Sequence, residues 1–322
     1  MRNLNRSILL LLLLSVFSCN RRSAPKVTDI KKWERSVINI ECLELRYSPE
    51  EIDQVITAEK LQRKLLTEED ELERRSELGR ETIPVSGTAI YVTDNGKKYL
   101  VTAKHVIYDP QESQSTTGPR LYRDISIRTP YEYFLKRKVN DASILSTGYG
   151  PVSPFYLSDD ATDIGIISLQ ASLTNFLIKT LEDDGYVPIN IADIDRSQNI
   201  STGEGIAAIG YPDISKVGVF QKRNDYQSNV VVLPVNTFGN IAMAHDQLSY
   251  FIGDITVYPG NSGGPVIKQD KLIGIVSGQV LIPVDQSNRL SSRGTLAKVI
   301  KAEYIIRGLR KLQETEADKS FR

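Results

Sequence analysis

The sequence predicts a mostly β domain that carries one helical insertion and ends in a helix. After Pro84 the chain consists of short alternating or apolar runs separated by Gly, Asn, Asp and Pro, which is the pattern of a barrel or a sandwich. β-branched residues are frequent after Ile83, and Tyr outnumbers Phe by 15 to 8, a usage that favours strands. A two-lobed β enzyme of about 200 to 250 residues would occupy most of the 322 residues.

The first 18 residues have the organisation of an export signal. Arg2 and Arg6 provide the basic region, 8–14 form an apolar run, and small residues lead to Cys19. That run is too short for a permanent span, and no later stretch approaches the roughly 20 apolar residues a spanning helix needs. Residues 16–19, Val-Phe-Ser-Cys, resemble a bacterial lipobox, although Phe is atypical there. This predicts lipidation of Cys19 and anchoring to a bacterial membrane in the cell envelope or periplasm. A plain cleaved signal with an incidental Cys is the alternative.

The counts of cysteine, charged residues and histidine argue against an intramolecular disulfide, a nucleic-acid partner and a metal site. If Cys19 carries lipid, Cys42 is the remaining thiol and no intramolecular disulfide can form. Cys42 lies in an apolar, strand-like run with no His nearby in sequence, so we expect a buried structural thiol. The 40 basic residues balance the 40 acidic ones, which gives no global field toward nucleic acid. With two distant histidines we expect no metal site, and we expect no cofactor.

The remaining elements follow along the chain. Residues 19–32 are polar and basic and form a tether, and one domain should extend over 33–314. A first strand is expected within 36–47. Ser48 followed by Pro49 and two acids then starts a helix, and 48–80 should form a solvated helical insertion.

The domain after the insertion should be rich in strands. Two runs flank Asp94-Asn95-Gly96, a strong hairpin signal. Helical spacing predicts a closing helix over 297–312, and 315–322 should be a polar tail. Strands are expected at 83–92, 98–102, 125–129, 164–169, 205–209, 217–221, 229–235, 265–268 and 272–276.

Residues 260–265, Gly-Asn-Ser-Gly-Gly-Pro, carry the strongest chemical signal. Glycines on both sides of Ser262 permit a tight turn whose N–H groups converge on one point, which is what an oxyanion hole requires. The alternative is a Gly/Ser-rich turn without chemistry.

A hydroxyl nucleophile needs a base, and the base needs a carboxylate to orient it. The candidate bases are His105, at the end of an apolar strand, and His245, in an expected loop. Asp163 stands at the entrance of an apolar strand and needs a partner there, whereas Asp159 and Asp160 look solvated. A simple strand cap is the alternative role for Asp163.

In this order, the motifs at 102–106, 163–166 and 260–265 resemble those of the trypsin-like serine proteases, most closely their disulfide-poor bacterial branch with the HtrA-type enzymes. Residues 36–40, 209–212 and 272–278 resemble further parts of that family. The resemblance implies two six-stranded antiparallel β-barrels. It implies Ser262 as nucleophile, His105 as general base, Asp163 as its orienting carboxylate, and the N–H groups of Gly260 and Ser262 as the oxyanion hole.

The resemblance also implies the substrate contacts and the activity. Ser277 and Gly278 would pair with the substrate main chain. Thr256 matches the base of the specificity pocket and is uncharged, so a small or medium apolar residue would be preferred over Lys or Arg. Asn261 stands where many relatives have Asp, which argues against zymogen cleavage, and no appended peptide-binding (PDZ) domain is expected.

We therefore expect a lipid-anchored serine endopeptidase that acts on proteins or peptides through an acyl-enzyme. The same triad would serve an esterase or a protease with one narrow target. The alternative from another class is a catalytically silent lipoprotein that binds peptide or protein partners.

Overall fold

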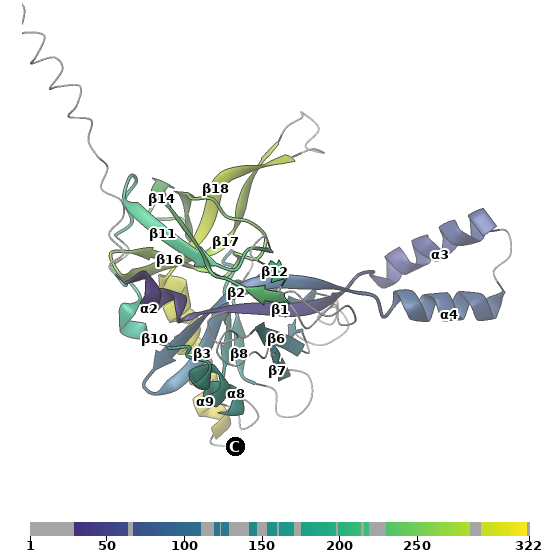
Figure 1. Cartoon of the computed structure of the whole chain (residues 1–322), viewed down its shortest axis with the longest axis horizontal. Helices are drawn as coiled ribbons and strands as arrows, with labels where there is room; N and C mark the ends of the chain where they lie inside the picture. Colours follow the sequence, from purple (N-terminus) through teal and green to yellow (C-terminus); the bar gives the residue numbers. More distant parts are fainter. Residues whose placement is uncertain are drawn as a thin grey trace, which may run out of the picture.

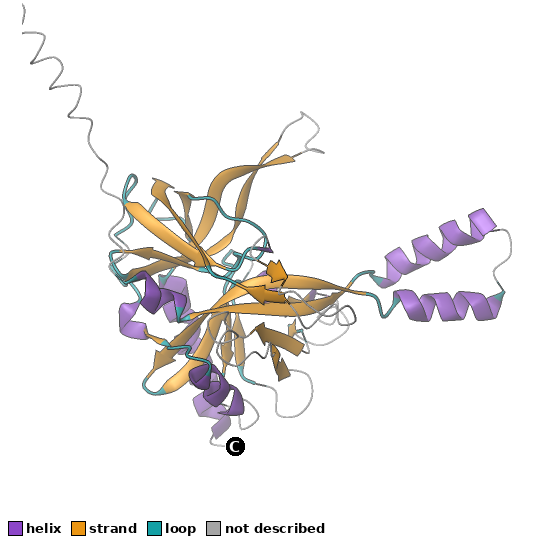
Figure 2. Cartoon of the chain, in the orientation of Figure 1, coloured by secondary structure: helices purple, strands orange, loops and turns teal. Residues whose placement is uncertain are grey.

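The computed structural model describes residues 29–63, 67–110, 119–122, 124–128, 142–146, 153–159, 161–170, 175–197, 199–213, 216–218, 230–283 and 291–320. The predicted signal, Cys19 and Asp160 lie outside these residues. The described part is mostly β and forms two lobes, with few helices (Figures 1 and 2). Among the helices described, none has the length and apolar character to cross a membrane.

The first lobe is an eight-stranded sheet. Seven strands follow the order β7-β6-β1-β2-β3-β9-β8, and β10 pairs with β2. The insertion interrupts the hairpin between β1 and β2. The bounds are β1 Val37–Leu45, β2 Thr82–Asp94, β3 Lys97–Thr102, β6 Asp124–Arg128, β7 Ala142–Ser146, β8 Phe155–Leu157, β9 Gly165–Ser168 and β10 Ile189–Asn190.

The hairpin predicted around residues 94–96 joins β2 to β3. Asn95 and Gly96 have φ angles of 49° and 81°, the left-handed conformation required at both centres of a two-residue turn. The register continues to Ala89 opposite Thr102. This hairpin therefore sets the register of β3 against β2 up to Thr102, the last residue of β3.

The second lobe is a closed six-stranded barrel in the order β11-β14-β15-β18-β17-β16. The predicted mostly β architecture, with a six-stranded antiparallel barrel, is confirmed. The first lobe differs from the implied six-strand count, because its described strands form an eight-stranded sheet whose path ends at β7 and β8. The barrel bounds are β11 Gly205–Gly210, β14 Val235–Met243, β15 Tyr250–Asp254, β16 Pro265–Lys268, β17 Lys271–Pro283 and β18 Ser291–Lys301.

Two short ribbons and three short helical segments also belong to the described body. One ribbon pairs β12 (Lys216–Gly218) with β13 (Val230–Val232), so the predicted run at 229–235 is divided between β13 and β14. The other pairs β4 (Tyr108–Asp109) with β5 (Arg120–Leu121). The helical segments are α2 Ile30–Glu34, α8 Asn175–Asp183 and the 3-10 turn η1 Ile191–Asp193.

The insertion is a helical hairpin formed by α3 (Pro49–Arg63) and α4 (Glu68–Leu78), and it projects from the far end of β1 and β2 (Figure 1). Ser48 and Glu51 exchange side-chain and backbone hydrogen bonds, which confirms the predicted helix start. Ile56 and Leu78 are buried but belong to none of the three core clusters of the described body. The buried apolar residues of the helical hairpin are therefore separate from the hydrophobic cores of the body.

The predicted closing helix was placed wrongly at both ends. Residues 297–301 belong to β18, which is paired with β15 and β17, and α9 covers Glu303–Ser320. Strand partners on both sides outweigh the helical spacing of this segment. The predicted polar tail is also helical through residue 320.

One hydrophobic core joins the two lobes and α9. It contains Trp33 and Val101 from the first lobe, Ile209 and Ile275 from the barrel, and Leu309 from α9. Cys42 lies in the neighbouring first-lobe core, as predicted, and burial raises the pKa of its thiol well above the ordinary value. The lobes are therefore held together by apolar packing as well as by the hydrogen bonds of the site.

Candidate active site

Ser262 lies on the loop between β15 and β16, and this loop fits closely against the first lobe. Gly263 has φ +87°, and a Cβ atom there would collide with Thr88 O and Thr102 Oγ1. It would also come within 2.9 Å of the backbone nitrogen of Ala103. Only glycine allows this approach, which sets the loop beside the residues that immediately precede His105.

Thr88 of β2 anchors the same loop by side chain and backbone. Its hydroxyl donates to Gly260 O at 2.7 Å and accepts from Tyr211 N at 2.9 Å. Its backbone N–H donates to Ser262 O at 2.8 Å. A single buried threonine of the first lobe thus fixes both ends of the Gly260–Ser262 turn.

His105 lies in the one-turn helix α5 (Lys104–Ile107), directly after β3. Its Nδ1 is 2.7 Å from Asp163 Oδ2, and its backbone N–H donates to Asp163 Oδ1 at 3.1 Å. Asp163 lies two residues before the start of β9 (Gly165), which is paired with β3, so the sheet brings Asp163 and His105 together. The imidazole is about half exposed, at 49%, while the carboxylate is at 22%.

Ser277 of β17 links the carboxylate to the nucleophile. Its hydroxyl donates to Asp163 Oδ2 at 2.8 Å, and its carbonyl accepts from Ser262 Oγ at 3.4 Å. Within the described residues, no hydrogen bond joins Ser262 to His105. The sequence indicated Ser277 for substrate pairing but gave no signal for its bond to Asp163.

The environment of Asp163 favours its ionised form. Burial by itself would raise the pKa of this carboxyl group. The hydrogen bonds and charge of His105, together with the hydroxyl of Ser277, outweigh that effect and hold the pKa below the ordinary value for aspartate. An ionised Asp163 can fix the Nδ1–H tautomer of His105, which leaves Nε2 free to accept a proton.

The Gly260–Ser262 turn carries two candidate oxyanion donors. Gly260 has φ +96°, and its carbonyl is held by Thr88. In the described part of the chain, the N–H groups of Gly260 and Ser262 donate to no protein acceptor, whereas that of Asn261 donates to Tyr258 O. Two N–H groups without a protein partner on one turn are available to bind an oxyanion.

The other predicted site residues lie apart from this network. Asp159 accepts hydrogen bonds from Thr162 and so caps a turn, while Asp160 is outside the described residues. His245 is exposed, and its Nδ1 accepts from Gln247 N. Thr256 is exposed in the segment that leads from β15 toward Ser262, and its role as pocket base stays a prediction.

Within the part of the chain that the structure describes, the edge of β17 next to Ser262 has no strand partner beyond residue 276. β16 pairs with β17 only as far as Ile275, and β18 occupies the opposite edge as far as Pro283. Ser277 and Gly278, predicted to pair with substrate, are therefore the first residues of an edge without a strand partner among the described elements. An extended peptide can add to such an edge as a strand.

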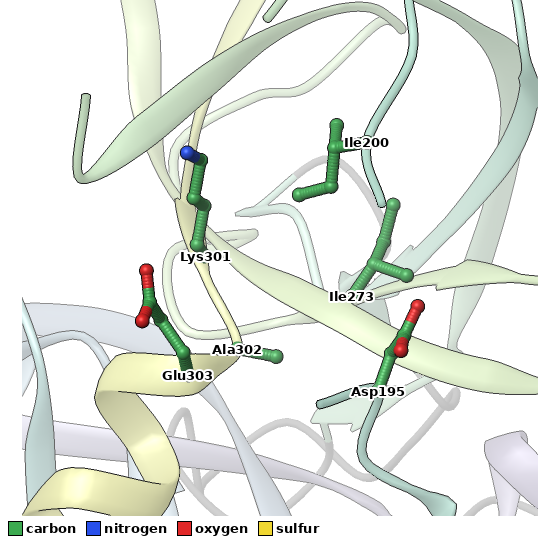
Figure 3. Close-up of a pocket in the computed structure, with 6 residues that line it drawn as sticks. All are labelled: Asp195, Ile200, Ile273, Lys301, Ala302 and Glu303. Carbon is green, nitrogen blue, oxygen red and sulfur yellow. The ribbon is translucent and has the colours of Figure 1, made fainter. Parts of the chain in front are cut away.

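A small pocket lies elsewhere, where β18 meets α9 (Figure 3). Lys301 extends from the end of β18, and its Nζ is bonded to the carbonyls of His245 and Asp246. None of the residues that line this pocket is a member of the predicted triad. The lining residues are Asp195, Ile200, Ile273, Lys301, Ala302 and Glu303.

Comparison with known proteins gave a family match and structural neighbours. Residues 87–275, more than half of the chain, match the model of the trypsin-like peptidase domain. The chain is similar to the crystal structure of the Rv3671c protease from M. tuberculosis in its active form, with 14% identity and a TM-score of 0.45, covering 90% of this chain and 88% of that one. The inactive form gives 12% identity and a TM-score of 0.41, covering 90% and 98%. No curated protein matches.

Proposed function

Because the chain belongs to the trypsin-like peptidase domain family, we propose that it is a serine endopeptidase with Ser262, His105 and Asp163 as its catalytic triad. The observation that carries this proposal is the 2.7 Å contact between His105 Nδ1 and Asp163 Oδ2, on a carboxylate that Ser277 connects to Ser262. The glycine loop then supplies both the nucleophile and two free N–H groups.

Acylation follows from this arrangement. Ser262 Oγ attacks the peptide carbonyl carbon while His105 Nε2 takes the hydroxyl proton, and Asp163 stabilises the resulting imidazolium. The carbonyl oxygen gains the negative charge and binds the N–H groups of Gly260 and Ser262. Collapse of this intermediate breaks the C–N bond, and His105 gives its proton to the departing amine.

Deacylation repeats these steps with water. His105 takes a proton from water, whose oxygen attacks the ester carbon, and the proton returns to Ser262 Oγ as the acid product leaves. Before acylation, the Ser262 hydroxyl must turn from Ser277 O toward His105. Rotation about χ1 of the half-buried Ser262 moves its Oγ between staggered positions.

The resting position of that hydroxyl favours a second candidate, a protease-fold protein that binds peptides without cutting them. The two candidates differ in what Ser262→Ala does. We expect the full-length protein in detergent to cleave unfolded casein into fragments that mass spectrometry detects, and Ser262→Ala to bind casein without cleaving it. Equal binding and no cleavage by both proteins, together with no fluorophosphonate label on Ser262 of the folded wild-type protein, would establish the binder instead.

We also propose that a lipid on Cys19 anchors the enzyme to the membrane of the cell envelope. The apolar run and the Val-Phe-Ser-Cys sequence support this proposal. Metabolic labelling with an alkyne fatty acid should mark the wild-type protein, and Cys19→Ser should abolish the label and release protein from the membrane fraction. A plain cleaved signal predicts no label and no change in fractionation.

A further inference from the structure

Three segments lie beside the proposed nucleophile, and we take the space between them as the position of a substrate side chain. β17 passes the nucleophile at Ser277, whose carbonyl accepts from Ser262 Oγ. Residues 255–258 lead into the Ser262 loop, and the turn that joins them is closed by the bond from Asn261 N to Tyr258 O. β18 lies on the far edge of β17 and forms the third side. A substrate side chain next to the cleaved bond must enter this space, because its carbonyl is held at Gly260 and Ser262 and its main chain runs along the β17 edge.

The side chain of Gln279 makes hydrogen bonds between these three segments. Gln279 follows Ser277 by two residues on β17, and its Nε2 donates to Val257 O at 2.5 Å. The same nitrogen lies 3.5 Å from Gly294 O of β18. The amide group of Gln279 thus connects β17 to residues 255–258 and to β18. This connection lies two residues along β17 from Ser277, whose carbonyl accepts from Ser262 Oγ.

We propose that Gln279 closes the pocket beside Ser262 and restricts cleavage to bonds that follow small residues such as Ala. The inference rests on the proposed endopeptidase activity and names the residue that sets its substrate class. A large side chain would have to displace the amide and leave the carbonyl of Val257 without its donor, which disfavours such substrates. A small side chain fits without breaking either bond.

Substitutions at Gln279 and at a control position distinguish an effect of the pocket from a general effect of changing β17. Gln279→Ala removes the bridge and opens the space. Leu281→Ala is the matched control, because Leu281 lies two residues further on the same strand and is exposed. Gln279→Glu is the second variant. It keeps the length of the side chain, but its carboxylate cannot donate to the two carbonyls and should leave the space.

Phosphonate probes measure which side chains the pocket accepts, and they do not require a known substrate. Diphenyl phosphonates of acetylated Ala and Phe would each be reacted with full-length protein in detergent, and adduct formation at Ser262 followed by mass spectrometry. A small alkyl fluorophosphonate, which needs no pocket, measures nucleophile reactivity in the same samples. Thermal unfolding of every variant reports whether it is folded.

We expect the wild-type protein and Leu281→Ala to react faster with the Ala probe. Gln279→Ala and Gln279→Glu should raise the Phe-to-Ala rate ratio by about 10-fold or more, because pocket contacts of this size discriminate by 10- to 200-fold. An unchanged ratio in both folded Gln279 variants, with normal fluorophosphonate labelling, would overturn the inference and leave the proposed function standing. An equal shift in Leu281→Ala would also overturn it. Absence of fluorophosphonate labelling in the wild-type protein would overturn the proposed function, and the inference with it.

Discussion

Asp163 receives three hydrogen bonds, which come from two parts of the fold. The His105 ring and the His105 backbone approach from α5, and Ser277 approaches from the barrel. The carboxylate therefore holds the imidazole in one orientation. Its bond to Ser277 forms only when the two lobes are correctly docked. Its contribution to rate and its contribution to stability can be measured separately.

Replacing Asp163 with Asn should lower turnover by about 1,000- to 10,000-fold, because an amide favours the wrong tautomer of His105. The fold should survive, since Asn has the same shape. The measurement is the fluorophosphonate labelling rate of Ser262 beside a thermal unfolding curve. A mild loss of rate in the folded variant would move the orienting role to another carboxylate.

Asp163 should also make stability depend on pH. Its pKa is lowered in the folded protein, so its stabilising effect is present above the pKa that Asp has in the unfolded chain, and it is lost as the pH falls through the lower folded value. Urea unfolding at several pH values should show wild type more stable than Asp163→Asn at neutral pH. That advantage should shrink below about pH 4. A difference independent of pH would contradict the assignment.

The sequence predicted the three triad candidates because each lies in a short motif at a strand end or a glycine turn. Thr88 and the hydroxyl of Ser277 could not be found in this way. Their partners are 172 and 114 residues away, and a lone Thr or Ser inside a strand has no local pattern that indicates such a bond. These two hydrogen bonds can be identified only from the three-dimensional arrangement of the two lobes.

Among the elements, those with strong local signals were predicted and those defined by distant partners were not. The hairpin at Asn95-Gly96 and the start of α3 at Ser48 follow from turn and capping chemistry. β15 and β18 were missed, because their pairing with each other and with β14 and β17 defines them. The helix α8 was also missed, although Leu177 and Leu181 lie one turn apart and are buried in the first-lobe core.

The helical hairpin should be separable from the catalytic body. Arg46 N donates to Glu81 O, so residues 47–80 can be replaced by Asn-Gly as a two-residue turn that closes this pair. We expect the deletion variant to fold with a melting temperature within a few degrees of wild type and to label at Ser262 at the same rate. Size-exclusion chromatography would report its oligomeric state.

A changed labelling rate in that folded variant would contradict the separation and assign the hairpin a role in controlling the site. The matched control keeps the hairpin and replaces Leu72, which is exposed on α4, with Ala. A change shared by both variants would locate the effect on the surface of α4.

For the molecule as a whole, the site depends on how the two lobes meet. The nucleophile loop comes from the barrel and the base and carboxylate from the first lobe, so catalysis requires docking to within a fraction of an ångström. The shared apolar core and α9 supply the packing, while Thr88 supplies the register. The open edge of β17 then lies next to the completed site.

Replacing Thr88 with Val should test this register. Val has nearly the same shape but leaves Gly260 O and Tyr211 N without their buried partner, which should cost about 1–3 kcal/mol of stability. Labelling of Ser262 should fall at least about 10-fold, because Gly260 carries an oxyanion donor. Thr93→Val is the control, since Thr93 bonds only Lys97 within the β2–β3 hairpin. Equal effects of the two changes would contradict a special role for Thr88.

The most direct test of the central claim is to label full-length protein in detergent with a fluorophosphonate and locate the adduct by mass spectrometry. The account predicts an adduct on Ser262 alone, its absence in Ser262→Ala, and its strong suppression in a folded His105→Ala variant, which has no base to accept the hydroxyl proton. Folded wild-type protein that takes up no label, or an adduct that forms rapidly in His105→Ala, would contradict it.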